Sequence, residues 1–132
     1  MLRIDAALRD EMVSHARADH PDEACGLVAG VDGRPTRVIQ MTNIARSPTF
    51  YEMDPKEQLL AFREMDDRDE ELVAIYHSHT ATEAFPSRTD IAIAGYPEAH
   101  YVLLSTREPE VEEIRSFRIV DGVVTEEPIE VG

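Results

Sequence analysis

Three segments of the chain have the apolar spacing that is typical of helices. Residues 5–19 place apolar side chains every four positions; Asp5 can cap this helix, and Pro21 forces it to end. Residues 54–68 begin with an acidic cap residue, a proline and then a glutamate, which favours a second helix. Residues 87–95 open with a serine whose hydroxyl can cap a third helix.

Six short apolar runs predict strands. Two of them are continuous, which suits strands buried on both faces, and four are joined in pairs by Asp-Gly turns, which favours hairpins. The continuous runs are 72–76 and 100–105, and the paired runs are 27–31 with 37–41 and 115–120 with 123–129. Helices interleaved with such strands indicate a single α/β domain over residues 1–132, with a mixed β-sheet and helices packed on it.

Composition and charge exclude several classes of protein. With 132 residues, of which 42% are hydrophobic, the chain is long enough and apolar enough to fold around its own core. Its 27 acidic residues outnumber 13 Lys and Arg, and the formal net charge is −14. Such a surface repels phosphate backbones and anionic membranes, so we expect neither nucleic acid nor a membrane as a partner. No apolar run is long enough to span a bilayer.

The cysteine content and the first residues favour a cytoplasmic protein. Cys25 is the only cysteine, so no internal disulfide is possible and a reducing compartment fits. We expect Cys25 to be a small core residue rather than a nucleophile. The first twelve residues, MLRIDAALRDEM, contain acids where a signal peptide has its apolar stretch.

Two histidines near the end of a predicted strand form a candidate metal site. Because side chains on a strand alternate with a period of two, His77 and His79 point to the same side. Zinc binds imidazole nitrogen readily, and a catalytic zinc keeps three protein ligands and one place for water. Asp90, in the first turn of the third helix, is a candidate third ligand. The activated water would need a neighbouring base, such as a carboxylate from elsewhere in the chain.

Each of these features also has a plainer structural interpretation. His-x-His can be the polar end of a strand, and Ser87-x-x-Asp90 is also the pattern of a helix capping box. We expect His15 and His20 to be solvated, since a spacing of five places them on different helical faces, and His100 to be a buried, hydrogen-bonded residue. A zinc deaminase is excluded because its Pro-Cys-x-x-Cys pair is missing.

The combined pattern is similar to that of a known family. Glu23 in the segment PDEACGL, then His77-x-His79, seven residues, and Ser87-x-x-Asp90 resemble the JAMM/MPN metallopeptidase pattern. The similarity extends over about residues 20–120. It implies a fold like that of cytidine deaminases, a mixed sheet with packed helices.

The resemblance implies a role for each matching residue. His77, His79 and Asp90 would bind one Zn²⁺ per chain. Glu23 would be the general base that takes a proton from the zinc-bound water and later returns it to the leaving nitrogen. Ser87 would hydrogen-bond the oxyanion of the tetrahedral intermediate. The implied reaction is hydrolysis of an amide or isopeptide bond.

Two positions next to the matched residues, Thr80 and Asp22, bear on the resemblance. Many eukaryotic members have proline directly after the second histidine, whereas this chain has Thr80. The ligand spacing is unchanged, so this departure bears on the substrate more than on the chemistry. Asp22 is a second candidate base beside Glu23, and the family position favours Glu23.

Longer segments along the chain, such as ARADHPDEACG and AHYVLLSTR, resemble family members that act on a ubiquitin-like sulfur-carrier protein. The implied substrate is such a carrier, ending in Gly-Gly and amide-linked to cysteine, and the implied product is free cysteine for cysteine biosynthesis. The cysteine carboxylate would need a cation, and Arg88 and Arg46 are candidates. The alternative for each arginine is a surface salt bridge.

Two other functions remain open from the sequence. One is a JAMM peptidase or isopeptidase that acts on another ubiquitin-like conjugate. The other is a non-catalytic MPN scaffold that binds proteins, which the intact set of five site residues disfavours.

Overall fold

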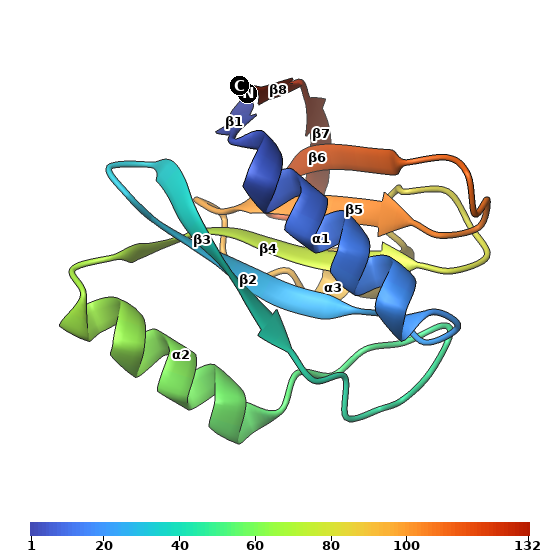
Figure 1. The fold of residues 1–132 in the computed structure, drawn as a ribbon, viewed down its shortest axis with the longest axis horizontal. Coiled ribbons are helices and arrows are strands. Elements are labelled where there is room, and N and C mark those ends of the chain that lie inside the picture. Colours follow the sequence, from blue (N-terminus) through green and yellow to red (C-terminus); the bar gives the residue numbers. More distant parts are fainter.

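The computed structural model describes residues 1–132, which form one main β-sheet with helices on both of its faces (Figure 1). The elements in chain order are β1 (Leu2–Ile4), α1 (Ala6–Asp19), β2 (Cys25–Val31), β3 (Arg34–Met41), α2 (Pro55–Asp67), β4 (Glu71–His79), α3 (Arg88–Ile93), β5 (His100–Ser105), β6 (Glu113–Val120), β7 (Val123–Glu127) and β8 (Ile129–Val131). This arrangement confirms the expected α/β domain with a mixed sheet.

The main sheet has six strands in the order β3-β2-β4-β5-β6-β7. β4 and β5 are parallel, and every other neighbouring pair is antiparallel. A parallel pair cannot be joined by a tight turn, so the chain between β4 and β5 crosses over one face of the sheet and carries α3.

Both faces of the sheet are buried, and consecutive residues of β4 enter different cores. Tyr76 packs on one face in a cluster with Met12 of α1. Ile75 packs on the other face in a cluster with Met65 of α2. The continuous apolar run at 72–76 is therefore a strand buried on both sides, as predicted.

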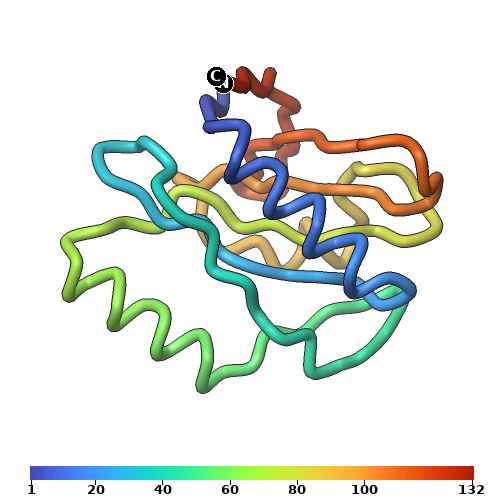
Figure 2. Tube along the Cα trace, viewed as in Figure 1, coloured from blue at the N-terminus to red at the C-terminus, as the bar shows by residue number.

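A second sheet of two short strands joins the ends of the chain, and the sequence pattern did not predict it. β1 pairs in parallel with β8, and the trace in Figure 2 brings the two ends together. The expectation of one strand over 123–129 is wrong, because Pro128 has no N–H for the ladder and separates β7 from β8. The carbonyl of Pro128 accepts a hydrogen bond from Leu2 N at 2.9 Å.

Two details at the helix ends also differ from expectation. Asp5 occupies the capping position of α1, but its side chain makes no capping hydrogen bond. α1 ends at Asp19, just before Pro21, as predicted. α3 ends at Ile93 rather than near Gly95.

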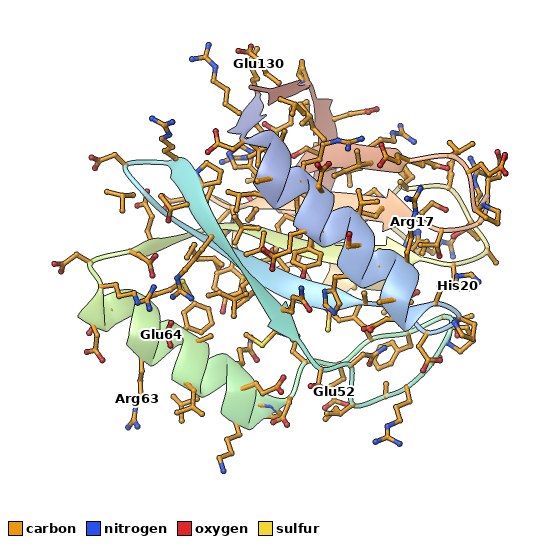
Figure 3. All side chains as sticks on the ribbon, in the orientation of Figure 1. Arg17, His20, Glu52, Arg63, Glu64 and Glu130 are labelled. Carbon is orange, nitrogen blue, oxygen red and sulfur yellow. The ribbon has the colours of Figure 1, made fainter.

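Charged side chains lie on the outside of the fold. Arg63 and Glu64 extend from α2 and Arg17 from α1 in Figure 3. Among the 27 acidic residues, Glu23 alone is buried, at 5% exposure. Burying one carboxylate without a fixed counter-charge is unfavourable, so Glu23 indicates a candidate functional site. No helix is long and apolar enough to cross a membrane.

Gly26 on β2 lets the ring of Tyr76 lie directly against the backbone of its neighbouring strand. A Cβ at position 26 would lie 2.4 Å from the Tyr76 hydroxyl oxygen, and the fully buried ring has no room to move away. This close approach is therefore the reason for glycine at this position.

We predict that Gly26→Ala destabilises the protein by about 1–3 kcal/mol, because an overpacked core must shift. Urea denaturation measures the change. Gly95→Ala is the matched control, since its Cβ would meet nothing closer than 3.9 Å. Equal midpoints for the two variants would contradict the packing argument.

Candidate metal centre

Two imidazoles lie on the same side of β4 at its end, as the strand period predicted. The ring centroids of His77 and His79 lie 5.2 Å apart, and both side chains are buried. Ser78 points to the opposite face, where its hydroxyl oxygen accepts a hydrogen bond from Ala24 N at 2.8 Å. The bond from Ser78 N to Ala24 O, at 3.0 Å, completes a pair that fixes this end of β4 against the start of β2.

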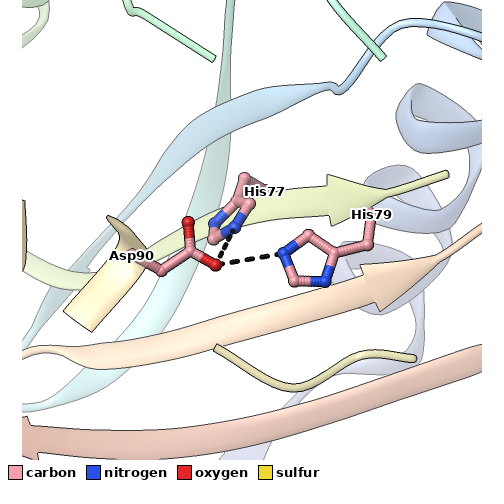
Figure 4. A group of neighbouring side chains, drawn as sticks. All are labelled: His77, His79 and Asp90. Atoms are coloured by element: carbon pink, nitrogen blue, oxygen red, sulfur yellow. Dashed lines mark hydrogen bonds and ion pairs between the residues drawn. The ribbon is translucent and has the colours of Figure 1, made fainter. Parts of the chain in front are cut away.

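Asp90 reaches the two histidines from the first turn of α3 (Figure 4). One carboxylate oxygen, Oδ2, lies 3.1 Å from His77 Nε2 and 3.0 Å from His79 Nε2. Ligand atoms of these three residues all lie within 4.8 Å of one another. The crossover between β4 and β5 thus brings the predicted third ligand back over the end of the strand.

The Nε2 atoms of both imidazoles face the Asp90 carboxylate, and they are the nitrogens that a metal would bind. The backbone carbonyl of Glu83 can only accept, so His79 Nδ1 carries the proton of their 2.9 Å hydrogen bond. His79 Nε2 faces Asp90 Oδ2 at 3.0 Å in hydrogen-bond geometry, and it is the nitrogen that a metal would bind in place of this contact. His77 Nε2 is buried and makes no hydrogen bond, since its contact with Asp90 has the distance but not the direction of one.

This donor set fits zinc. Two neutral imidazole nitrogens and one carboxylate oxygen are the ligands of a three-residue zinc site that keeps one place open. Ligand atoms around one tetrahedral zinc lie about 3.3 Å apart, close to the nitrogen–oxygen distances found between Asp90 and each histidine. The carbonyl of Glu83 holds the second histidine in the required tautomer, as outer partners of metal ligands do.

Burial and neighbouring charges set the ionisation of Asp90. Burial alone would raise its pKa, but the contacts with His77 and His79 and the N–H of Ser87 outweigh it and hold the pKa of this carboxyl well below its usual range. Asp90 is therefore ionised at neutral pH, as a metal ligand must be.

Glu23 precedes β2 and borders the same cavity as the ligands. A polar cavity of about 260 Å³ is lined by Glu23, Ser87, His79 and Asp90 among others. Burial raises the pKa of Glu23 to about 7, a shift that His79 opposes and Asp90 reinforces. A carboxylate with a pKa near neutrality, facing a metal site, is suited to accept and return a proton.

Ser87 serves as the cap of α3, and its position allows a second role. Its Oγ accepts a hydrogen bond from Asp90 N at 3.1 Å, while Asp90 Oδ2 accepts from Ser87 N at 2.8 Å. This is the capping box that the sequence predicted. Because a hydroxyl can accept and donate at once, the O–H of Ser87 remains able to donate into the cavity that it lines.

The other candidate residues lie farther from the ligands. Arg88 is exposed and does not line the ligand cavity, although Ser87 and Thr89 on either side of it do. Arg46 borders a separate polar cavity of about 550 Å³, together with Asp22 and Glu23. Only Glu23 borders both cavities, which favours it over Asp22 as the base.

The arginines do not form the surface salt bridges that were their alternative interpretation. Arg46 and Arg88 lie within 4.0 Å of no carboxylate, while eight other ion pairs involve arginine. Both cations therefore remain available for an anionic group.

One of the remaining histidine predictions is wrong. His15 is buried rather than solvated, because α1 lies flat on the sheet and directs it at Tyr76, whose hydroxyl is 2.6 Å from His15 Nδ1. His20 is exposed, as expected. His100 is half-buried and bonded to Glu127 at 2.7 Å, and Cys25 is a buried core residue.

Tyr51 is a residue of the site that the sequence pattern did not reveal. Its ring stacks on His77, with centroids 4.5 Å apart and planes at 29°. It also lies between the polar cavity and an apolar cavity of about 380 Å³ that extends from His77 and Asp90. Tyr51 belongs to an irregular segment without periodicity, so no local signal pointed to it.

This fold and site define a JAMM-type metal-binding domain of the JAB/MPN class. The chain matches the family Prok-JAB, prokaryotic homologs of the JAB domain, over residues 5–120, and it belongs to that family.

The chain is similar to a peptidase, to a desampylase and to a protein of solved structure. The chain is 62% identical to the CysO-cysteine peptidase of Mycobacterium tuberculosis, over 99% of this chain and 91% of that protein. It is 35% identical to the desampylase of Haloferax volcanii, over 79% and 80% of the two chains. The solution structure of a protein from Desulfitobacterium hafniense superimposes with a TM-score of 0.89 at 37% identity, covering 100% of this chain and 93% of that one.

We predict that the protein binds one zinc ion per chain, and that His79→Ala loses it, because two remaining ligands do not hold the ion. Elemental analysis after gel filtration measures the zinc. His100→Ala is the matched control, since His100 is also paired with an acid, Glu127, but lies outside the cluster. Equal zinc content in the two variants would contradict the assignment of the ligands.

We also predict a pH-dependent effect of Glu23→Gln on the metal-free protein. The folded pKa of about 7 lies above the ordinary value of 4.5, so ionisation of Glu23 destabilises the fold as pH rises from 4.5 through 7. Glu23→Gln should therefore raise the melting temperature by a few degrees at pH 8 and leave it unchanged at pH 4.

Thermal scans at both pH values measure this difference. Asp22→Asn is the control, because Asp22 is only half-buried and its neutralisation should change the melting temperature less at pH 8. A Glu23→Gln variant that is no more stable than wild type at pH 8 would show that Glu23 carries no burial penalty.

Proposed function

We propose that this protein is a zinc-dependent hydrolase that cleaves the amide bond between the C-terminal glycine of a ubiquitin-like sulfur-carrier protein and cysteine. The observation that carries the proposal is the cavity that the buried Glu23 lines together with His79 and Asp90, two members of the cluster of His77, His79 and Asp90. The 62% identity to a CysO-cysteine peptidase over nearly the whole chain supports the substrate.

His77, His79 and Asp90 would hold the zinc ion. Zinc bound there would supply Lewis-acid activation of the amide carbonyl and of a water molecule. Each ligand has a fixed partner on its other side: Tyr51 stacks on His77, the Glu83 carbonyl holds His79, and the Ser87 N–H holds Asp90.

Glu23 would move the proton of the reaction. As a carboxylate it would accept a proton from the attacking water, and as a carboxylic acid it would donate that proton to the departing nitrogen of cysteine. Its raised pKa suits both directions of transfer. The hydroxyl of Ser87 would donate a hydrogen bond to the oxygen on which negative charge develops.

The carboxylate of the cysteine moiety needs a cation that the ligand cavity does not contain. Neither lysine nor arginine lines that cavity, so the cation must come from its rim. Arg88 follows Ser87 directly, and Arg46 lies on the far side of Glu23. We propose that one of these unpaired arginines binds the carboxylate.

The remaining expectations concern the whole chain and its location. The pairing of β1 with β8 and the one main sheet of six strands support one metallopeptidase domain over residues 1–132. The one cysteine, buried and unpaired, supports a cytoplasmic location.

The decisive experiment is the intact mass of a carrier–cysteine conjugate before and after incubation with the protein. We expect the loss of one cysteine with the wild type and no change with Glu23→Gln, because that variant cannot move the proton. Arg46→Ala and Arg88→Ala in the same assay assign the carboxylate contact, through a raised KM for the one that binds it.

Two outcomes would redirect the proposal. An unchanged conjugate with a zinc-loaded wild type, together with cleavage of a lysine-linked conjugate, would identify a peptidase acting on another conjugate, as the desampylase similarity suggests. A wild type that binds carriers, holds no zinc and cleaves neither would identify a non-catalytic scaffold.

A further inference from the structure

Asn43 is a buried polar residue at the end of β3, and every hydrogen-bonding group of its side chain is used. Its Nδ2 donates to Glu23 O at 2.9 Å and to Phe50 O at 3.1 Å. Its Oδ1 accepts from Ala45 N and from Glu52 N, both at 3.0 Å. The amide orientation is unambiguous, because the two carbonyls can only accept and the two N–H groups can only donate.

One of these bonds joins the backbone of Glu23 to the segment 43–53, here called the 43–53 loop, and the other three lie within that segment. The loop closes on itself through the bond from Ile44 N to Glu52 O at 2.9 Å and a bridge between Asn43 and Met53. No helix or strand supports the loop between these contacts, so the Asn43 side chain is its internal brace.

The 43–53 loop reaches the metal centre at three points. Ser47 O accepts the N–H of Glu23 at 2.9 Å, and Pro48 O accepts the hydroxyl of Thr80 at 2.8 Å, one residue beyond His79. Tyr51 stacks on His77. The backbone of Glu23 is therefore held on both sides of its Cα, by Ser47 at the N–H and by Asn43 at the carbonyl.

We propose that Asn43 is a positioning residue, which fixes the general base and the 43–53 loop in one arrangement relative to the metal ligands. The proposal rests on the proposed role of Glu23. Asn43 does not line the cavity of the metal ligands; it acts through the backbone of Glu23 and through the loop that bears Tyr51. A displacement of a catalytic group by about 1 Å lowers rates on the order of a hundredfold, so a shift of this backbone would affect the rate directly.

The chemistry at position 43 requires an amide. Two donors and one oxygen that accepts twice are needed at the same place, and aspartate or serine cannot supply both donors. Asn43→Asp keeps the oxygen that closes the loop and loses the two donors. It therefore removes the anchor of Glu23 and the bond to Phe50 O but keeps the two bonds that Asn43 Oδ1 accepts within the 43–53 loop, whereas Asn43→Ala removes all four.

The test compares Asn43→Asp with Thr42→Val. Thr42 is the neighbouring residue, and its hydroxyl donates to Glu57 of α2 at 2.8 Å rather than to Glu23 or the loop. Thr42→Val thus removes a hydrogen bond at the same end of β3. Each variant is assayed for kcat and KM on the carrier–cysteine conjugate, zinc content, melting temperature and amide hydrogen exchange of Glu23 by NMR.

For Asn43→Asp we expect kcat to fall at least tenfold, with KM changed less than threefold, zinc content unchanged and faster exchange at the Glu23 amide. Thr42→Val should leave kcat and the Glu23 exchange as in wild type. Where Asn43→Ala folds, its additional loss of loop closure should raise KM as well.

Three results would overturn the proposal. The first is an unchanged kcat in Asn43→Asp. The second is a loss of kcat in Asn43→Asp that matches its loss of zinc or that occurs equally in Thr42→Val. The third is hydrogen exchange at the Glu23 amide of Asn43→Asp that is as slow as in the wild type. A wild type that is itself inactive on the conjugate defeats the proposed function instead. Hydrogen exchange alone then decides whether Asn43 anchors the Glu23 backbone.

Discussion

The parallel pairing of β4 with β5 is the constraint on which the metal centre depends. Because two parallel neighbours cannot be joined by a tight turn, the chain must leave the end of β4 and return to the start of β5 across one face of the sheet. α3 lies on this path, and its capping box places Asp90 over the two histidines. If β5 ran antiparallel to β4, a tight turn could join the two strands, and the histidines would lack this third group.

The metal centre combines residues on regular secondary structure with residues on irregular backbone. The ligands stand on β4 and on a capped helix, and each is held by a further contact. Glu23 and Tyr51 belong to irregular backbone, where no ladder of hydrogen bonds defines their place. The side chain of Asn43 supplies the missing order there, with four bonds in a buried setting where each unpaired group would cost about 1–3 kcal/mol.

The parts of the structure that the sequence predicted are those with a local cause. The period of two placed His77 and His79 on one face, and a spacing of three made Ser87 and Asp90 a capping box; both follow from geometry within one element. The return of Asp90 to the strand end is not local, and there the family resemblance was needed to name the ligand set.

The features that the pattern missed depend on contacts distant in the chain. β1 and β8 are three residues each and exist only because they pair with one another across the whole sequence. His15 has the polarity of a surface residue, and its burial against Tyr76 follows from how α1 crosses the sheet. Asn43 and Tyr51 lie in a segment without periodicity, so their roles became visible only when the 43–53 loop was seen against Glu23 and His77.

Tyr76 and His77 are adjacent in the chain, yet they face opposite sides of the sheet. Tyr76 belongs to the core beneath α1 and bonds His15, whereas His77 belongs to the metal centre. A single peptide unit thus separates the core beneath α1 from the metal centre. A change of packing around Tyr76 that shifts the backbone of β4 therefore also shifts His77. Substitutions beneath α1 and substitutions at the metal centre should therefore be thermodynamically coupled, and their free energies should not add as those of independent sites do.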